Sequence, residues 1–211
     1  MGTNVISVTR QFGSLGRPIA KMVAERMGYE YLDRDIIETA AAQLGEPVYK
    51  LSEYEDRVLT PYEKMAFPLG FGTSEKQNRL FEIEKKIILD FTAERNCVIV
   101  GRCSDYILRM AGIPNLLNVF IYAPYEVRYN YCLTYLGFSE DAVEKYIDKI
   151  DSGRSGYYKK YTGENFDSTK YRDLMISSAY LPLEKLVALI CAAAKLKFGE
   201  KGQESEETCS E

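Results

Sequence analysis

Histidine is absent from the 211 residues of this chain. Because histidine titrates near neutral pH and is the commonest metal ligand, its absence excludes a Ser-His pair, a histidine general base and a histidine-ligated metal. Carboxylates, arginines, lysines, tyrosines and backbone amides must therefore carry any chemistry. Phosphoryl transfer suits this inventory, because it depends mainly on positioning and on charge neutralisation.

Cysteines and long apolar runs are also scarce. The five cysteines have no Cys-x-x-Cys spacing; they stand at positions 97, 103, 132, 191 and 209. This pattern argues against a disulfide framework or a zinc site and favours a reduced, cytoplasmic setting. No apolar run approaches the roughly 18 residues of a membrane span, and the first residues lead into a predicted strand with no signal peptide. We therefore expect a soluble cytoplasmic protein that does not bind membranes.

Positive charge is not in excess either. The net charge is −4 and the pI is near 5.2, which argues against broad binding to nucleic acid. Local groups of arginines can still bind small anions. The 46% of hydrophobic residues suffices for a core. We expect one domain over residues 1–198, followed by an acidic, disordered tail over 199–211 that lacks apolar periodicity.

Short apolar runs alternate with segments of helical spacing. Strands are predicted at 5–8, 29–32, 97–101, 117–123 and 173–177, and helices at 19–27, 36–44, 79–95, 126–135, 139–153 and 182–197. This alternation predicts an α/β fold with a parallel sheet covered by helices. Prolines, glycines and aromatic residues interrupt it at about 46–78, which predicts a short helical insertion. The aromatic residues of 45–82 allow two interpretations: a homodimer contact, or burial within one chain.

The loop between the first strand and the first helix reads Arg10-Gln-Phe-Gly-Ser-Leu-Gly-Arg17. Backbone amides at a helix start lack partners, and the helix dipole favours an anion there. Gly13 and Gly16 would let the backbone around Ser14 curl about a phosphate. Arg10 and Arg17 could donate charge-assisted hydrogen bonds to its oxygens. The alternative is a turn whose glycines serve geometry alone.

Charged residues follow three of the predicted strands. Arg10, Asp33 and Arg102 each stand just after a strand. Ligands of open parallel sheets bind beyond the carboxyl ends of the strands, so we expect these three side chains to converge at one edge.

A second basic segment lies at about 148–166. A glycine-containing turn that carries Arg154, Lys159 and Lys160 would suit a lid that closes on phosphates. The alternative is a solvated polar helix end followed by a tyrosine-rich loop. Arg128, after the fourth strand, could point to the same place or form a surface ion pair.

In their order and spacing, these residues resemble the cytidylate kinase-like family of the P-loop nucleoside monophosphate kinases, over about residues 4–197. The segment "AERMGYEYLD" at 24–33 is similar to the family's helix and strand that end in Tyr-Leu-Asp. The family's Gly-Arg-Asp resembles Gly-Arg-Cys at 101–103, and its fourth strand with x-x-E-x-R resembles "NVFIYAPYEVR" at 118–128. Its lid motif Arg-Asp-x-x-Asp-x-x-Arg resembles 147–154, and its closing Ile-Asp-Thr-Ser resembles 175–178.

The resemblance implies a three-layer αβα P-loop kinase fold with five parallel strands in the order 2-3-1-4-5. It implies transfer of the γ-phosphoryl group of ATP, with Mg²⁺, to a nucleoside monophosphate such as CMP or dCMP. Gly13 and neighbouring amides would bind the donor phosphates and Arg102 the acceptor phosphate. Arg128 and Arg154 would neutralise charge on the transferring group, and Asp33 would lie on the acceptor-binding side, near the phosphates or the hydrated Mg²⁺. The acceptor oxygen is already ionised, so no general base is needed.

The P-loop departs from the family pattern. The position of its lysine falls on Gly16, and the metal-binding Ser/Thr position falls on Pro18, which has neither hydroxyl nor amide N–H. Arg17 is predicted to replace the lysine as a catalytic cation, with a planar fork in place of a point charge. The sequence assigns no metal ligand.

The acceptor side departs as well. Cys103 stands in place of the aspartate, with Asp105 as the nearest carboxylate for the acceptor, and Ile147 replaces the first lid arginine. Two alternatives to a nucleoside monophosphate kinase therefore stay open. One is a kinase of another small phosphorylated acceptor, and the other is a nucleotide-binding regulatory protein with negligible transfer.

Overall fold

A computed structural model describes residues 2–33, 36, 38, 39, 42, 43 and 73–199 of the chain. Its sheet has five parallel strands in the order β2-β3-β1-β4-β5, which confirms the predicted fold class and strand order. The central strands are mostly buried on both faces; β3 is accordingly a continuous apolar run, whereas β1 and β4 also bury the polar side chains of Ser7, Thr9 and Asn118. The strands are β1 (Val5–Arg10), β2 (Glu30–Leu32), β3 (Cys97–Val100), β4 (Leu116–Tyr122) and β5 (Leu174–Ser177).

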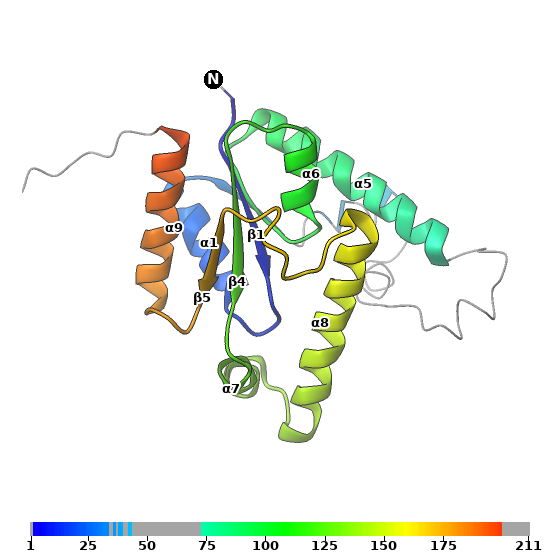
Figure 1. Cartoon of the computed structure of the whole chain (residues 1–211), viewed down its shortest axis with the longest axis vertical. Coiled ribbons are helices and arrows are strands. Elements are labelled where there is room, and N and C mark those ends of the chain that lie inside the picture. Colours follow the sequence, from blue (N-terminus) through cyan, green and yellow to red (C-terminus); the bar gives the residue numbers. More distant parts are fainter. Residues whose placement is uncertain (1, 34–35, 37, 40–41, 44–72, 200–211) are drawn as a thin grey trace, which may run out of the picture.

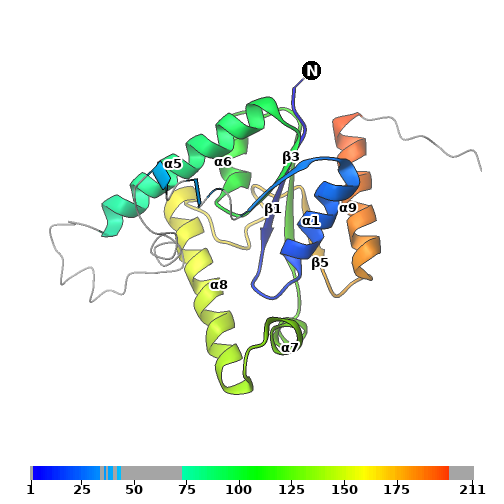
Figure 2. The same cartoon turned by 180° about the vertical axis from the view of Figure 1, so that it is seen from behind.

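Helices cover both faces of this sheet. Figures 1 and 2 show α1 and α9 on one face and α5, α6 and the upper part of α8 on the other. The short helix α6 was not predicted, whereas the others overlap predicted helical segments. The described helices are α1 (Gly16–Met27), α5 (Thr73–Glu94), α6 (Ser104–Met110), α7 (Tyr125–Leu136), α8 (Glu140–Thr162) and α9 (Leu183–Phe198).

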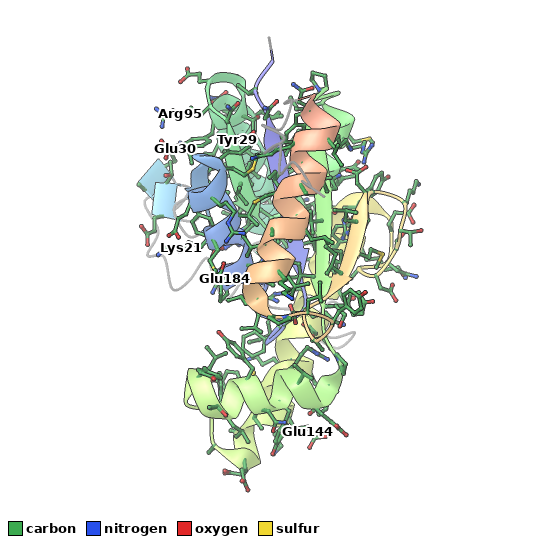
Figure 3. All side chains as sticks on the ribbon, turned by 90° about the vertical axis from the view of Figure 1, so that its left-hand side faces the viewer. Lys21, Tyr29, Glu30, Arg95, Glu144 and Glu184 are labelled. Atoms are coloured by element: carbon green, nitrogen blue, oxygen red, sulfur yellow. The ribbon has the colours of Figure 1, made fainter. Side chains whose placement is uncertain are left out.

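The α1–α9 face encloses the larger apolar cluster. Ile19 of α1 and Leu186 of α9 pack with Ile6 of β1, and all three are at most 1% exposed. Each such side chain contributes about 1.5–3 kcal/mol on burial. Figure 3 faces this layer and shows Lys21 and Glu184 on its outer surface. The packing of α1 against β1 and α9 therefore fixes the position of its first turn, at the end of the loop that follows β1.

The opposite face holds a second cluster, in which Ile88 of α5 and Leu108 of α6 pack with Ile99 of β3. The hydroxyls of Ser7 in β1 and Ser104 in α6 form a buried hydrogen bond of 2.7 Å. Because α6 starts at this contact, the turn after β3 is anchored beside β1.

The carboxyl ends of the strands lie at the lower end of the sheet in Figure 1, where the blue turn joins β1 to α1. Helices α7 and α8 lie around this end. Helix α8 is continuous through residue 162, so the expectation of a glycine turn within 148–166 was wrong. Glycine costs a helix only about 1 kcal/mol, and the buried side chains of Val143, Ile147 and Tyr158 anchor the helix on both sides of Gly153.

Several predicted segments fall wholly or partly outside the described residues. The insertion at 46–78 is described only from residue 73, where α5 already begins. Within the helix expected at 36–44, the described residues are helical. The acidic tail beyond residue 199 is not described. Among the helices of the described ranges, none combines the length and apolarity needed to cross a membrane.

Candidate phosphate-binding site

The loop after β1 leads directly into the N-terminus of α1. Its last residue, Leu15, has a φ of 61° and provides no side-chain cap to the helix. The amides of the first turn therefore keep the capacity to bind an anion that helix N-termini have in general. The buried hydroxyl of Ser14 donates to the carbonyl oxygens of Gln11 and Ile121, so it fixes the loop to β4.

Gly13 is constrained by the neighbouring helix α7. It has a φ of 74°, and a Cβ atom there would lie 3.0 Å from the carbonyl oxygen of Arg128 and 3.1 Å from Sγ of Cys132. Both the backbone conformation and the close approach of α7 therefore require glycine at this position.

Helices α7 and α8 hold the same loop through polar contacts. The carboxylate of Asp151 in α8 accepts a hydrogen bond from the Phe12 amide at 2.8 Å and pairs with Arg128. Arg128 also donates to the carbonyl oxygen of Phe12. Arg154, one turn further along α8, donates to the carbonyl oxygen of Arg10 at 3.1 Å. The segment predicted as a lid thus contacts the loop predicted to bind phosphate.

Two arginines, Arg10 and Arg17, pair with the carboxylate of Asp33. Arg17 Nε lies 2.7 Å from its Oδ2, and Arg10 Nη2 lies 3.8 Å from its Oδ1. Burial and the neighbouring charges of Arg154 lower the pKa of Arg10 to about 9. Burial likewise lowers the pKa of Arg102 to about 9, with Arg10 and Asp33 among the charges that act on it. Both groups still carry their charge at neutral pH, so the edge of the sheet is strongly positive.

Sequence reasoning missed a second carboxylate. Glu84 of α5 is fully buried, its Oε1 lies 3.6 Å from Nη1 of Arg102, and its Oε2 accepts a hydrogen bond from the Tyr157 hydroxyl at 2.8 Å. Its position offers a signal, because Leu80, Glu84 and Ile88 follow one another at helical spacing in an otherwise apolar stripe. A charged residue in such a stripe is normally paired.

Glu84 makes stability depend on pH. Burial raises its pKa from 4.5 to about 8, although the hydrogen bond from Tyr157 lowers it. Between these values the folded chain holds a proton that the unfolded chain releases, so this stabilisation is present below pH 4.5 and is lost as pH rises towards 8. We expect Glu84→Gln to gain stability relative to wild type as pH rises from about 5 to 8, measured by urea unfolding. Glu82→Gln, on the exposed face of α5, is the control; a wild-type–Glu84→Gln difference that stays constant with pH would contradict this.

Asp105 does not join the arginines at the strand ends. It is 1% exposed, forms an ion pair with Arg172 and accepts a hydrogen bond from the Tyr158 hydroxyl at 3.0 Å. The guanidinium of Arg172 lies over the rings of Phe120 and Tyr158. The structure thus gives Asp105 a structural contact in the core in place of the predicted acceptor contact, because α6 turns its side chain inward.

The other predicted site residues do come together. Gly13, Ser14, Gly16 and Arg17 form the loop and helix start, and Arg10 and Asp33 lie beside them. Arg102, Arg128 and Arg154 reach the same end of the sheet from the turn after β3, from α7 and from α8. An anionic ligand with several phosphates suits this arrangement, since arginines and helix N-termini are the usual phosphate binders.

The fold and this site define a P-loop kinase, a class of phosphotransferase. The chain matches the cytidylate kinase-like family over residues 5–180. It belongs to this family. No curated protein matches it significantly.

Solved structures share the fold at low sequence identity. An uncharacterized protein from Eubacterium ventriosum is 18% identical, with a TM-score of 0.69, and the match covers 92% of this chain and 99% of that one. The shikimate kinase from Bacteroides thetaiotaomicron is 14% identical, with a TM-score of 0.54 and coverage of 91% and 98%. The shikimate kinase from Acinetobacter baumannii, in complex with shikimate, is 14% identical, with a TM-score of 0.52 and coverage of 94% and 95%. These likenesses concern the fold.

Proposed function

We propose that the chain transfers the γ-phosphoryl group of ATP to a nucleoside monophosphate such as CMP or dCMP. The observation that carries this proposal is the excess of arginines at the strand ends. Arg10, Arg17, Arg102 and Arg154 lie near one another there, and two carboxylates of the described residues pair with members of this group, Asp33 with Arg10 and Arg17 and Glu84 with Arg102. A site with this charge suits two substrates that both carry phosphates.

Each element would hold one part of the reacting pair. The loop amides at the start of α1 would bind the donor phosphates, and Arg102 would hold the acceptor phosphate from the turn after β3. Arg154 and Arg128, carried by α8 and α7, would neutralise charge as the phosphoryl group moves. The contacts of α8 with the loop would place this helix over the transferring group, where it would limit the access of water and favour transfer over hydrolysis.

Mg²⁺ fits this site with few protein ligands. Pro18 has no hydroxyl to offer, and the hydroxyl of Ser14 is engaged with main-chain oxygens. Asp33 is already paired with Arg17 and Arg10, so it would act on a hydrated Mg²⁺ that the nucleotide phosphates hold, which agrees with the small number of protein ligands that Mg²⁺ commonly has. When bound, Mg²⁺ would neutralise negative charge on the phosphate oxygens.

A coupled assay of ADP release tests the proposal. ATP, Mg²⁺ and one of a panel of nucleoside monophosphates are incubated with the full chain. We expect turnover of about 1–100 s⁻¹, the ordinary range of kinases, with one pyrimidine monophosphate far above the others. ADP release that is the same with every monophosphate and without any acceptor would contradict transfer to this class of acceptor.

One observation favours a second candidate acceptor, another small phosphorylated molecule. Cys103 stands where the family has an aspartate, and its side chain is only 5% exposed and packed in the apolar cluster behind the turn. It therefore gives an acceptor base no polar contact. Turnover with a sugar phosphate but with no nucleoside monophosphate would favour this candidate. Nucleotide binding without turnover of any acceptor would favour a regulatory role.

A further inference from the structure

The side chain of Arg10 crosses the site between two glycines. It starts at the end of β1. A Cβ atom on Gly16 would lie 2.5 Å from its Cβ and 2.8 Å from its Cγ, and a Cβ atom on Gly101 would lie 2.2 Å from its Nη1. All three distances are far shorter than a carbon contact allows. The stem of Arg10 thus fills the space of a side chain at position 16, and its guanidinium fills the space above the turn after β3.

The charge of Arg10 is only partly compensated within the described residues. Its side chain is 12% exposed, and Asp33 lies 3.8 Å from it. The same carboxylate is held more closely by Arg17, at 2.7 Å, and Arg10 Nε has no hydrogen-bond partner among the described residues. A buried charge is costly unless it is paired and hydrogen-bonded. Arg10 therefore keeps capacity for an anion.

Arg17 differs on each of these counts. Its side chain is 56% exposed, and both Nε and Nη2 already contact Asp33, at 2.7 Å and 3.4 Å. The predicted substitute for the P-loop lysine is thus tied to a carboxylate at the rim, while the buried cation is Arg10.

Gly16 stands at the position of the P-loop lysine, and the stem of Arg10 fills the space of its missing side chain. We propose that Arg10 supplies, from the end of β1, the fixed cation for the terminal phosphates of a nucleoside di- or triphosphate that the P-loop lysine supplies in other kinases of this fold. This inference rests on the proposed function and names the residue that takes over the charge. It also explains why positions 16 and 101 are both glycine, since one arginine occupies the space at each.

Nucleotide binding tests the inference without an acceptor or turnover. The affinities of the full chain for ADP and AMP are measured by calorimetry without Mg²⁺. We expect Arg10→Met to weaken ADP binding about 100-fold and AMP binding less than about 3-fold, because AMP lacks the second phosphate. Arg10→Lys keeps the positive charge but loses the planar guanidinium that binds two phosphate oxygens at once, so we expect ADP affinity to fall about 10-fold. Arg26→Met, on the outer side of α1 and paired with Glu184, is the control with unchanged affinity.

Gly16→Ala tests the geometry while Arg10 stays in the chain. Its methyl group displaces the arginine stem, so ADP affinity falls about 10-fold or more, and adding Arg10→Met causes no further loss. The melting temperature without ligand distinguishes this role from a merely structural one. Because Arg10→Met removes a poorly compensated buried charge, we expect its melting temperature to equal or exceed that of wild type, whereas loss of a structural contact would lower it. Unchanged ADP affinity in Arg10→Met, equal losses for ADP and AMP, or no ADP binding by wild type would overturn the inference. Absence of turnover alone would overturn only the proposed function.

Discussion

Replacement of Arg102 by methionine is expected to lower kcat/KM for the acceptor by about 10³-fold, while KM for ATP changes less than about 3-fold. The side chain lies at the turn after β3, where Gly101, Arg102 and Cys103 have φ values of 79°, 59° and 52°. Three consecutive residues in the left-handed region are costly, and such strain is found where function requires it. The turn aims one guanidinium at the strand ends, so its loss removes a charge clamp of the kind that accounts for several powers of ten in phosphoryl transfer.

Steady-state kinetics with the preferred acceptor measure this effect. Arg109→Met is the matched control, since Arg109 lies on the following helix and pairs with Asp173 away from the site. Its kinetics should equal those of wild type. The melting temperature of Arg102→Met should stay close to that of wild type, because burial raises the pKa of Glu84, so this carboxyl can take up a proton when its partner Arg102 is removed. An acceptor kcat/KM within about 3-fold of wild type would show that Arg102 does not hold the acceptor phosphate.

Asp105→Ala is expected to lower the free energy of unfolding by about 3–5 kcal/mol, because it leaves the guanidinium of Arg172 buried without its counter-charge. Both partners of this ion pair are 1% exposed. The pair joins α6 to the segment that leads into β5, and Tyr158 of α8 donates to the same carboxylate. The loss should therefore affect the whole fold and not one loop.

Urea unfolding measures this change. Asp90→Ala serves as the comparison, because Asp90 and its partner Lys86 form an exposed i, i+4 pair on α5 that contributes about 0.3–0.5 kcal/mol. A loss below about 1 kcal/mol in Asp105→Ala would mean that Arg172 finds other compensation.

The sheet could be predicted from the sequence because its signals are local. Most strands are short, largely apolar runs, and the parallel arrangement follows from the helices between them. The strand order came from the family resemblance, since order depends on contacts between distant segments. Helix α6 was missed because its seven residues are too few to show a clear period. The glycine-containing turn expected around Arg154 proved helical, because the packing of α8 outweighs the modest free-energy cost of glycine in a helix.

The candidate site was predictable only in part. Arg10, Asp33 and Arg102 were placed together correctly, because residues that follow parallel strands share one edge. The buried Glu84 comes from a helix that packs over the site: its place in the apolar stripe of α5 indicates burial, but it does not identify Arg102 as its partner. The inward turn of Asp105 and the path of Arg10 over two glycines depend on side-chain packing, which the order of residues does not reveal.

Transfer of labelled γ-phosphate from ATP to CMP tests the central claim most directly, because it separates phosphoryl transfer from hydrolysis. We expect the label in CDP with wild type and a loss of at least about 100-fold in Arg102→Met at limiting acceptor concentration. Label that stays in ATP or appears only as inorganic phosphate, with CMP and with every other nucleoside monophosphate, would contradict the account.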